Sequence, residues 1–411
     1  MTHDILDPCR STASSASPRP SSPSIRKRWR APVLVLAAIG AGAVGWSGHV
    51  LALPVALIFP VLWSAAPSRS TAALLSAGYF LAASRGLPQG VAAFFASDLW
   101  LGALLWLGAS TCFILVQTTL WTKRTGPGKG LRFLIATLLM AIPPFGITGW
   151  AQPITAAGVL FPGWGWWGMA ATVVLLGVLA TRRWPLAAII VAGFWSWFAA
   201  SWTSPALPTG WTRIDLELGQ TLGRDATLER QRDLARRVRR AAARGARVAI
   251  LPESALGLWT PTLELFWRHE LRAVDMTVIA GAVVIDRDGY DNVMVEVSAA
   301  AGKVLYRERM PVPVSMWQPW RTWVGQPGGA RAHLFADPVA IVESTRIVPL
   351  ICYEQLLVWP ILQSMLGAPD LVVGISNAWW TAGSSIAAIQ QSSMIAWAKL
   401  FHLRLIMAFN T

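Results

Sequence analysis

Two strings decide how this chain folds: Leu251-Pro252-Glu253-Ser254-Ala255 and, further along, Pro349-Leu350-Ile351-Cys352-Tyr353-Glu354. In each string, an apolar run typical of a buried strand ends, and one reactive group follows at its tip. The first tip carries the carboxylate of Glu253 and the second carries the thiol of Cys352. A carboxylate that takes a proton and a thiol that attacks a carbonyl are two of the three parts needed for cysteine-based acyl transfer.

The composition indicates that much of the chain avoids water. Hydrophobic residues make up 54% and charged residues only 14%, whereas a soluble domain carries about a quarter charged residues. Many of the 24 tryptophans flank apolar runs, where an amphipathic ring suits a bilayer interface. The net charge is +14, and part of the positive charge lies in short segments between those runs. This positive charge is interpreted as a signal for the orientation of the chain in a membrane rather than for nucleic-acid binding, because no basic stripe interleaved with aromatics occurs.

Apolar runs before residue 204 predict a multi-span α-helical membrane domain of about seven helices over 31–203, since a helix of about 20 apolar residues crosses a bilayer. Positive charges in alternate connections, at Arg69, Lys123-Arg124 and Arg182-Arg183, place those connections in the cytoplasm. An odd number of crossings then puts 204–411 on the outer face. A basic tail rich in Ser and Pro, over 1–30, is expected to be disordered. The apolar runs are 32–48, 50–67, 71–87, 97–121, 132–151, 156–180 and 184–203.

The remaining part, 204–411, alternates helical and strand patterns and predicts an α/β layered domain with a mixed sheet. The three cysteines show neither a disulfide framework nor metal-ligand spacing, and no Gly-rich phosphate loop occurs. We therefore expect no metal and no cofactor. The expected helices cover 225–246, 261–273 and 383–403, and the expected strands cover 248–251, 277–285, 292–298, 304–306, 347–352 and 371–375.

This C-terminal part resembles the nitrilase, or carbon–nitrogen hydrolase, superfamily. Together with the apolar part before it, it resembles the apolipoprotein N-acyltransferases, which place a multi-span membrane domain before a periplasmic nitrilase domain. The resemblance implies an α/β/β/α sandwich with a Glu–Lys–Cys triad. It rests on the two strings above together with Tyr290-Asp291-Asn292, Tyr306 followed by Val312-Pro313, Ile375-Ser376-Asn377-Ala378-Trp379-Trp380, Gln390, Gln391 and Asn410.

The string Met310-Pro311-Val312-Pro313-Val314-Ser315-Met316-Trp317-Gln318-Pro319-Trp320 resembles a narrower group. This group is the TraB proteins of rhizobial and agrobacterial conjugative plasmids, which are nitrilase-like membrane proteins of DNA transfer. The superfamily continues with closing strands beyond the position of Asn410, so we expect a C-terminally short domain over 204–411.

The resemblance also implies roles for individual residues. Cys352 is the implied nucleophile, Glu253 the general base and Glu354 a supporting carboxylate near the site. The implied substrate-binding residues are Tyr306, Asn377, Trp379 and Trp380.

One position departs from the superfamily pattern. Two residues after the tyrosine the superfamily has a lysine that stabilises the oxyanion formed on attack, and this chain has Glu308 there. A carboxylate at that place would repel both a thiolate and an oxyanion. Strand alternation directs the flanking Arg307 and Arg309 to the opposite face, unless a bulge turns one of them inward. Arg309 is the candidate substitute for the lysine, although an arginine cannot shuttle a proton.

Two hypotheses for function remain open. The first is a membrane-anchored cysteine amidase or N-acyltransferase of the bacterial inner membrane, acting in plasmid conjugal transfer through a thioester on Cys352. Its expected partners are the lipid bilayer, a phospholipid acyl donor or a membrane-held peptide such as a pilin, and other conjugation proteins, without direct nucleic-acid contact. The second, favoured by Glu308, is a catalytically inactive binding or scaffold component of the conjugation envelope apparatus. A transporter is disfavoured because the spans hold almost no buried charge and no broken-helix pair.

Overall fold

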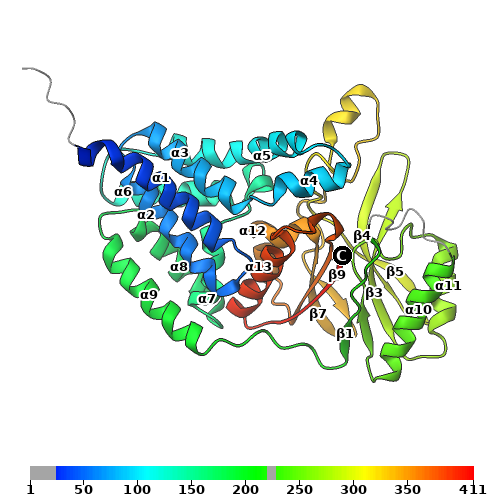
Figure 1. The fold of residues 1–411 in the computed structure, drawn as a ribbon. Coiled ribbons are helices and arrows are strands. Elements are labelled where there is room, and N and C mark those ends of the chain that lie inside the picture. The colour runs from blue at the N-terminus through cyan, green and yellow to red at the C-terminus, as the bar shows by residue number, and fades with distance from the viewer. Residues whose placement is uncertain (1–24, 220–227) are drawn as a thin grey trace, which may run out of the picture.

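The computed structural model describes residues 25–219 and 228–411. Within them, a group of N-terminal helices lies beside two stacked sheets that carry helices on their outer faces (Figure 1). The tail expected over 1–30 lies outside the described residues up to 24. Its last residues belong to α1 (Ile25–Gly45), so the first helix begins before the boundary that the sequence predicted.

The N-terminal helices follow the predicted apolar runs, but most are shorter than the runs. Among the described residues, α5 (Leu99–Leu120) is the one helix long and apolar enough to cross a membrane. At 1.5 Å per residue it is about 33 Å long, against a hydrocarbon thickness of about 30 Å. The prediction of seven spans is therefore not confirmed. The remaining helices are α2 (Ile58–Ala65), α3 (Arg69–Ala83), α4 (Leu87–Phe95), α6 (Pro127–Leu139), α7 (Ala157–Leu160), α8 (Gly165–Leu179) and α9 (Trp184–Ala200).

Prolines explain why several apolar runs do not form one long helix. A proline inside a helix removes a backbone hydrogen bond and clashes with the preceding turn. Pro54 lies in a 3-10 helix (Val50–Leu57) that precedes α2. The run after α6 contains Pro143 and Pro144 and continues only as short 3-10 turns, the second of which begins at Pro153. A long apolar run in this chain therefore does not always form a helix of the same length.

The C-terminal part contains two sheets, as the α/β/β/α sandwich implied by the resemblance requires. The first sheet is mixed: its first three strands are parallel and the next two add to it as antiparallel hairpins. The second sheet has one antiparallel edge strand and three parallel strands. The first consists of β1 (Trp211–Arg213), β2 (Val248–Ile250), β3 (Thr277–Ile285), β4 (Tyr290–Val297) and β5 (Gly302–Arg307), and the second of β6 (Ala340–Val342), β7 (Thr345–Ile351), β8 (Leu371–Asn377) and β9 (Arg404–Asn410), both in this order.

Side-chain alternation along the strands builds the layers. In β2, Val248 and Ile250 point into the core between the sheets, where Ile351 of β7 also lies. Ala249 and the following Leu251 point the other way, under the helices that cover the first sheet. Those helices are α10 (Leu228–Ala243) and α11 (Pro261–Leu271), and the helices that cover the second sheet are α12 (Val358–Met365) and α13 (Ile386–Leu400).

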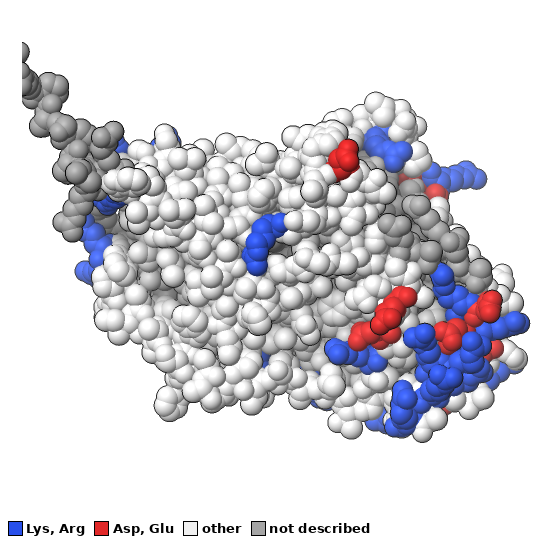
Figure 2. All heavy atoms as spheres, in the orientation of Figure 1, with Lys and Arg blue, Asp and Glu red and all other residues white. Residues whose placement is uncertain are grey.

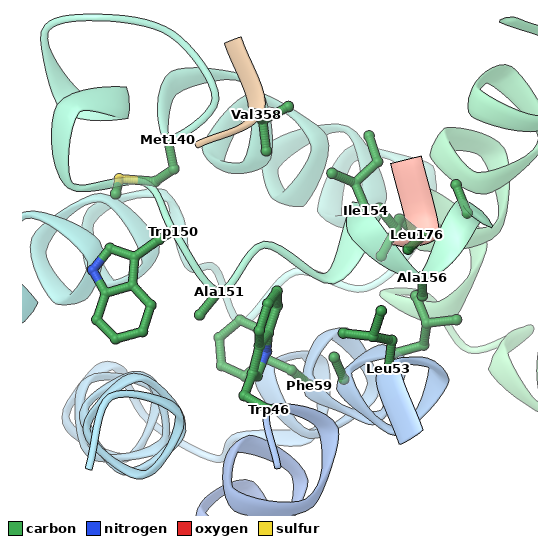
Figure 3. Close-up of a cluster of buried hydrophobic side chains, with 14 of the residues drawn as sticks. Trp46, Leu53, Phe59, Met140, Trp150, Ala151, Ile154, Ala156, Leu176 and Val358 are labelled. Carbon is green, nitrogen blue, oxygen red and sulfur yellow. The ribbon is translucent and has the colours of Figure 1, made fainter. Parts of the chain in front are cut away.

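The N-terminal helices and the second sheet share one hydrophobic core. Figure 3 shows part of it, in which Trp46, Phe59 and Trp150 of the N-terminal part pack together with Val358 of α12. Gly158 of α7 lies directly on α13, because a side chain there would bring its Cβ to 1.8 Å from a backbone oxygen of α13. The predicted parts 31–203 and 204–411 are therefore packed together as layers of one molecule.

Charge is distributed unevenly over the surface. On the face drawn in Figure 2, acidic and basic side chains gather over the end that carries α10 and α11. The surface of the N-terminal helices on this face is almost free of charge. Large apolar side chains are exposed along these helices, among them Leu36, Leu104, Leu107, Ile189 and Trp197.

Candidate active site

Glu253 and Cys352 meet at the end of the two central strands that precede them. Glu253 lies in the turn after β2, and Cys352 directly follows β7. Their side chains lie close enough for each to shift the pKa of the other, and both residues are buried. Cys352 has a left-handed backbone with a φ of 45°, and Ser254 next to Glu253 has a φ of 56°. Such backbones are uncommon for residues other than glycine and cluster at functional sites.

A glycine in the neighbouring strand makes room for the turn that carries Glu253. The turn crosses β3 at Gly281, whose N–H donates to the carbonyl oxygen of Pro252 at 3.1 Å. A Cβ on Gly281 would lie 2.4 Å from the Cα of Glu253. The position of the carboxylate therefore depends on a residue without a side chain in β3.

The carboxyl group of Glu253 is held at both oxygens. Asn292 of β4 donates its side-chain N–H to Oε1 at 2.8 Å, and the backbone N–H of Asn377 donates to Oε2 at 2.9 Å. Burial raises the pKa of Glu253 to about 7, against the lowering effect of the hydrogen bonds from Asn292, Cys352 and Asn377. A carboxylate with this pKa is suited to act as a general base near neutral pH.

Glu308, which stands where the superfamily has its lysine, also lies in this cluster. It is completely buried, and its Oε2 accepts a second hydrogen bond from the Asn292 side chain at 2.9 Å. Its Oε1 is buried and has no hydrogen-bond partner among the described residues. Burial, with the nearby charges of Glu354 and Glu253, raises the pKa of Glu308 well above its usual range.

The thiol of Cys352 is a weak acid in these surroundings. Burial raises its pKa well above the usual value, and the charge of Glu253 adds to the effect. A protonated thiol attacks poorly, so a nucleophilic role for Cys352 would require Glu253 to remove its proton. The amide of Gln390 on α13 donates to the carbonyl oxygen of Cys352 at 2.9 Å and holds this backbone in place.

Glu354 supports the site from below, as the sequence predicted, and it takes Arg309 as its partner. Its Oε2 accepts from the backbone N–H of Ile351 at 2.8 Å, and its Oε1 accepts from the hydroxyl of Tyr306 at 2.7 Å. Arg309 is fully buried, with its Nε 3.9 Å from Glu354. The carboxylate therefore orders the loops that follow β5 and β7.

The structure does not place Arg309 where the superfamily lysine would act. Arg309 lies beyond the end of β5, so the alternation of side chains along the strand does not determine its direction. The strand ends at Arg307, which pairs with Asp291. The guanidinium of Arg309 instead donates to the Tyr306 hydroxyl at 2.9 Å and to Ser364 of α12 at 3.0 Å. Its side-chain contacts are thus with Tyr306, Glu354 and α12, and they give the prediction of a substitute cation no support.

An apolar cavity of about 320 Å³ opens beside Cys352 and extends into the N-terminal helices. Leu105, Gly108 and Ala109 of α5 line its far side. Almost all of the lining is hydrocarbon, and only a few polar side chains, such as Gln390, lie near the thiol end. The cavity therefore joins the candidate nucleophile to the helix that is long enough to cross a membrane.

The four predicted substrate-binding residues take different positions. Trp380 lines the cavity, and Gly90 of α4 leaves space for its ring, since a Cβ there would lie 2.6 Å from it. Trp379 stacks on Phe94 of α4 with ring centroids 6.1 Å apart. The other two support the catalytic cluster: Tyr306 bonds Glu354, and Asn377 bonds Glu253.

Asn292 and Gln390 are functional candidates to which the sequence assigned no role. Asn292 bridges the carboxyl groups of Glu253 and Glu308, and its place at the end of the string Tyr290-Asp291-Asn292 is the signal that marked it. In the described ranges, 25–219 and 228–411, no group of three or more His, Cys, Asp or Glu residues is arranged to hold a metal ion.

Comparisons with known proteins agree with this geometry. The carbon–nitrogen hydrolase family model matches residues 81–399. The conjugal transfer protein TraB of Agrobacterium fabrum is 57% identical over 421 residues, which cover 100% of both chains. The probable conjugal transfer protein TraB of Sinorhizobium fredii is 60% identical over 379 residues, covering 92% of this chain and 98% of the relative.

Among solved structures, a mutant amidase of the nitrilase superfamily from Nesterenkonia is 11% identical with a TM-score of 0.39. That match covers 50% of this chain and 78% of the amidase. Two findings assign the sequence to a family: the family model matches most of the chain, and the full-length relatives have high identity to it. The chain belongs to the carbon–nitrogen hydrolase family and, within it, to the group of conjugal transfer proteins named TraB.

Proposed function

We propose that this chain is a membrane-anchored cysteine amidase or N-acyltransferase-type enzyme that acts in plasmid conjugal transfer. The observation that carries the proposal is the close approach of the Glu253 carboxyl group and the Cys352 thiol, with Cys352 lining an apolar cavity that reaches α5. The names of the two TraB relatives support a role in conjugation.

The reaction would proceed through a thioester. Glu253 takes the proton of the Cys352 thiol while the sulfur forms a bond to the acyl carbon, and the carbonyl electrons move onto the oxygen. When the tetrahedral intermediate collapses, the bond to the leaving group breaks and the leaving group takes the proton from Glu253. Water or an amine then attacks the thioester with Glu253 as base, which yields a free acid or a new amide and restores the thiol.

The apolar cavity supports a substrate with a hydrocarbon portion. Its lining offers no partner for a charged group along α5, so an acyl chain or an apolar peptide segment fits it better than a polar ligand. The candidates are a phospholipid acyl donor and a membrane-held peptide such as a pilin. Both are held at a bilayer, and the cavity places the thiol within their reach.

Membrane anchoring is part of the proposal. The length of α5, the exposed apolar side chains of the N-terminal helices and their nearly uncharged surface in Figure 2 support a position in the bacterial inner membrane. The basic connections support an orientation with the C-terminal part in the periplasm, where it would meet other conjugation proteins. An alkaline phosphatase fused after Thr411 should be active if this orientation is right and inactive if the C-terminus is cytoplasmic.

Plasmid transfer tests the chemistry. In a conjugative plasmid that lacks this gene, wild type and Cys112→Ala should restore transfer, whereas Cys352→Ala should not, at equal protein levels. Cys112 lies in α5 and is the other free cysteine among the described residues, so it is a matched control for loss of a thiol. Full transfer with Cys352→Ala would refute the enzyme.

That outcome would instead favour a scaffold component of the conjugation apparatus. The observation on which this second candidate rests is Glu308, a carboxyl group at the position of the superfamily lysine. In that case the sandwich would be retained for binding other envelope proteins, and substitutions on its surface rather than at the thiol would reduce transfer.

A further inference from the structure

We propose that Glu308 replaces the superfamily lysine as a neutral acid, whose carboxylic O–H donates the hydrogen bond that stabilises the oxyanion formed when Cys352 attacks an acyl group. The inference rests on the proposed function, because it names the donor that acyl transfer at Cys352 requires. It also gives a catalytic role to Glu308, the residue that otherwise favours an inactive scaffold.

The first supporting observation is the position of the side chain. Glu308 directly follows β5, and its backbone N–H donates to the carbonyl oxygen of Asn292 at 2.9 Å. The side chain of the same Asn292 then bonds the carboxyl groups of both Glu308 and Glu253. One asparagine thus holds the base and the candidate donor together, and both carboxyl groups lie close enough to Cys352 for a charge on either to raise the pKa of its thiol.

The second observation is the balance of buried charge. Glu253, Glu308 and Glu354 are all buried within this cluster. Among the described residues, Arg309 is the one cation paired with any of them, and its partner is Glu354. An ionised Glu308 would be a third buried carboxylate without a counter-charge, which is strongly unfavourable. Burial accordingly raises the pKa of Glu308 well above its usual range, which, like the missing counter-charge, favours the neutral acid.

The third observation is the unpaired oxygen. Oε2 of Glu308 accepts a hydrogen bond from Asn292, whereas Oε1 is buried without a partner among the described residues. A protonated carboxyl group has one O–H donor, and Oε1 is the oxygen free to carry it. A buried donor without an acceptor is costly unless a ligand atom satisfies it. The oxyanion of a bound acyl group is such an acceptor.

The chemistry balances without a cation. The thiol proton goes to Glu253, the carbon–sulfur bond forms, and the negative charge that develops on the acyl oxygen accepts a hydrogen bond from Glu308. Glu308 keeps its proton throughout, so it does not have to be reprotonated between steps. A carboxylic acid kept neutral by an apolar site is an established way to donate a hydrogen bond to an oxyanion.

Two reactions of the same thiol separate this role from a structural one. Thioester formation with 4-nitrophenyl octanoate passes through an oxyanion, whereas alkylation by iodoacetamide does not. Both rates would be measured on the purified full-length chain in detergent micelles, by 4-nitrophenolate release and by intact mass. The variants are Glu308→Gln, whose amide N–H can donate in place of the acid, and Glu308→Leu, which has similar size but no donor.

The expected result is a change in acylation alone. Glu308→Leu should slow acylation by on the order of 10²–10³-fold, the loss typical of one oxyanion donor. Glu308→Gln should stay within about tenfold of wild type, because a neutral donor is retained. Both variants should alkylate at the wild-type rate, since replacing a neutral acid by a neutral side chain leaves the charge beside the thiol unchanged. Wild-type alkylation also shows that each variant is folded.

Other outcomes would overturn the inference. If both variants alkylate faster than wild type, Glu308 is ionised at rest and is not a neutral donor. If Glu308→Leu acylates as fast as wild type, another group stabilises the oxyanion. Failure of the proposed function gives a different result, in which the wild-type thiol alkylates but no variant, including wild type, forms a thioester with the octanoate ester.

Discussion

Replacing Glu253 by Gln should make the stability of the folded chain less sensitive to rising pH, although it removes the general base. Burial raises the pKa of this carboxyl group from 4.5 to about 7. The folded chain therefore holds a proton that the unfolded chain releases. The resulting stability is fully present below about pH 4.5 and is lost as the pH rises through about 7.

The size of the effect follows from the pKa difference. The change from 4.5 to about 7 corresponds to roughly 3 kcal/mol, at about 1.4 kcal/mol for each tenfold change in proton affinity. Glu253→Gln cannot ionise and avoids this loss. The wild-type chain should therefore lose about 3 kcal/mol more stability than the variant between pH 4.5 and pH 8.

Thermal unfolding in detergent, followed by tryptophan fluorescence at several pH values, measures this difference. The comparison uses the change with pH and not the absolute stability, because altered hydrogen bonds to Asn292 and Asn377 shift the variant equally at all pH values. Glu229→Gln, on the exposed face of α10, is the control and should follow wild type. Parallel curves for wild type and Glu253→Gln would refute the raised pKa and with it the assignment of a base suited to neutral pH.

Three further substitutions probe the fold around the site. Gly281→Ala should slow acylation by 4-nitrophenyl octanoate by roughly 10²-fold, because the added Cβ displaces the turn that carries the base. Gly193→Ala is the control, because a Cβ there meets nothing within 4 Å, and it should not slow acylation. Equal acylation rates for the two variants would contradict the close approach of Gly281 to this turn. Gly108→Leu should fill the cavity, since the Cβ position of Gly108 is open, and should slow acylation by octanoate esters but not by acetate esters. Equal slowing with both esters would count against a cavity for an acyl chain. Arg309→Met should lower the free energy of unfolding by about 3–5 kcal/mol by leaving Glu354 unpaired. Adding Glu354→Gln should recover much of that loss in thermal unfolding, and no recovery would mean that the pair does not act as a unit.

The sequence by itself determined the chemistry-bearing residues and most of the sheet elements. The apolar run over Thr277–Ile285 was predicted with the bounds of β3, because a buried strand bounded by turn residues is a local pattern. The same locality placed Glu253 and Cys352 at strand tips, and the superfamily strings around them implied that they meet. The short strands β1 and β6 were missed, since three residues carry too little pattern, and the longer β9 (Arg404–Asn410) was missed as well.

Only the tertiary structure decided the lengths of the N-terminal helices, the place of Arg309 and the state of Glu308. Prolines interrupt apolar runs that hydropathy alone joins into spans. Arg309 turns toward α12 because β5 ends at Arg307, a boundary set by pairing with β4 and not by alternation. Glu308 reads as a charge in the sequence, but the closing of the two sheets removes it from water and leaves it without a counter-charge. Protonation depends on solvation and neighbouring charges, which exist only once distant segments are packed together.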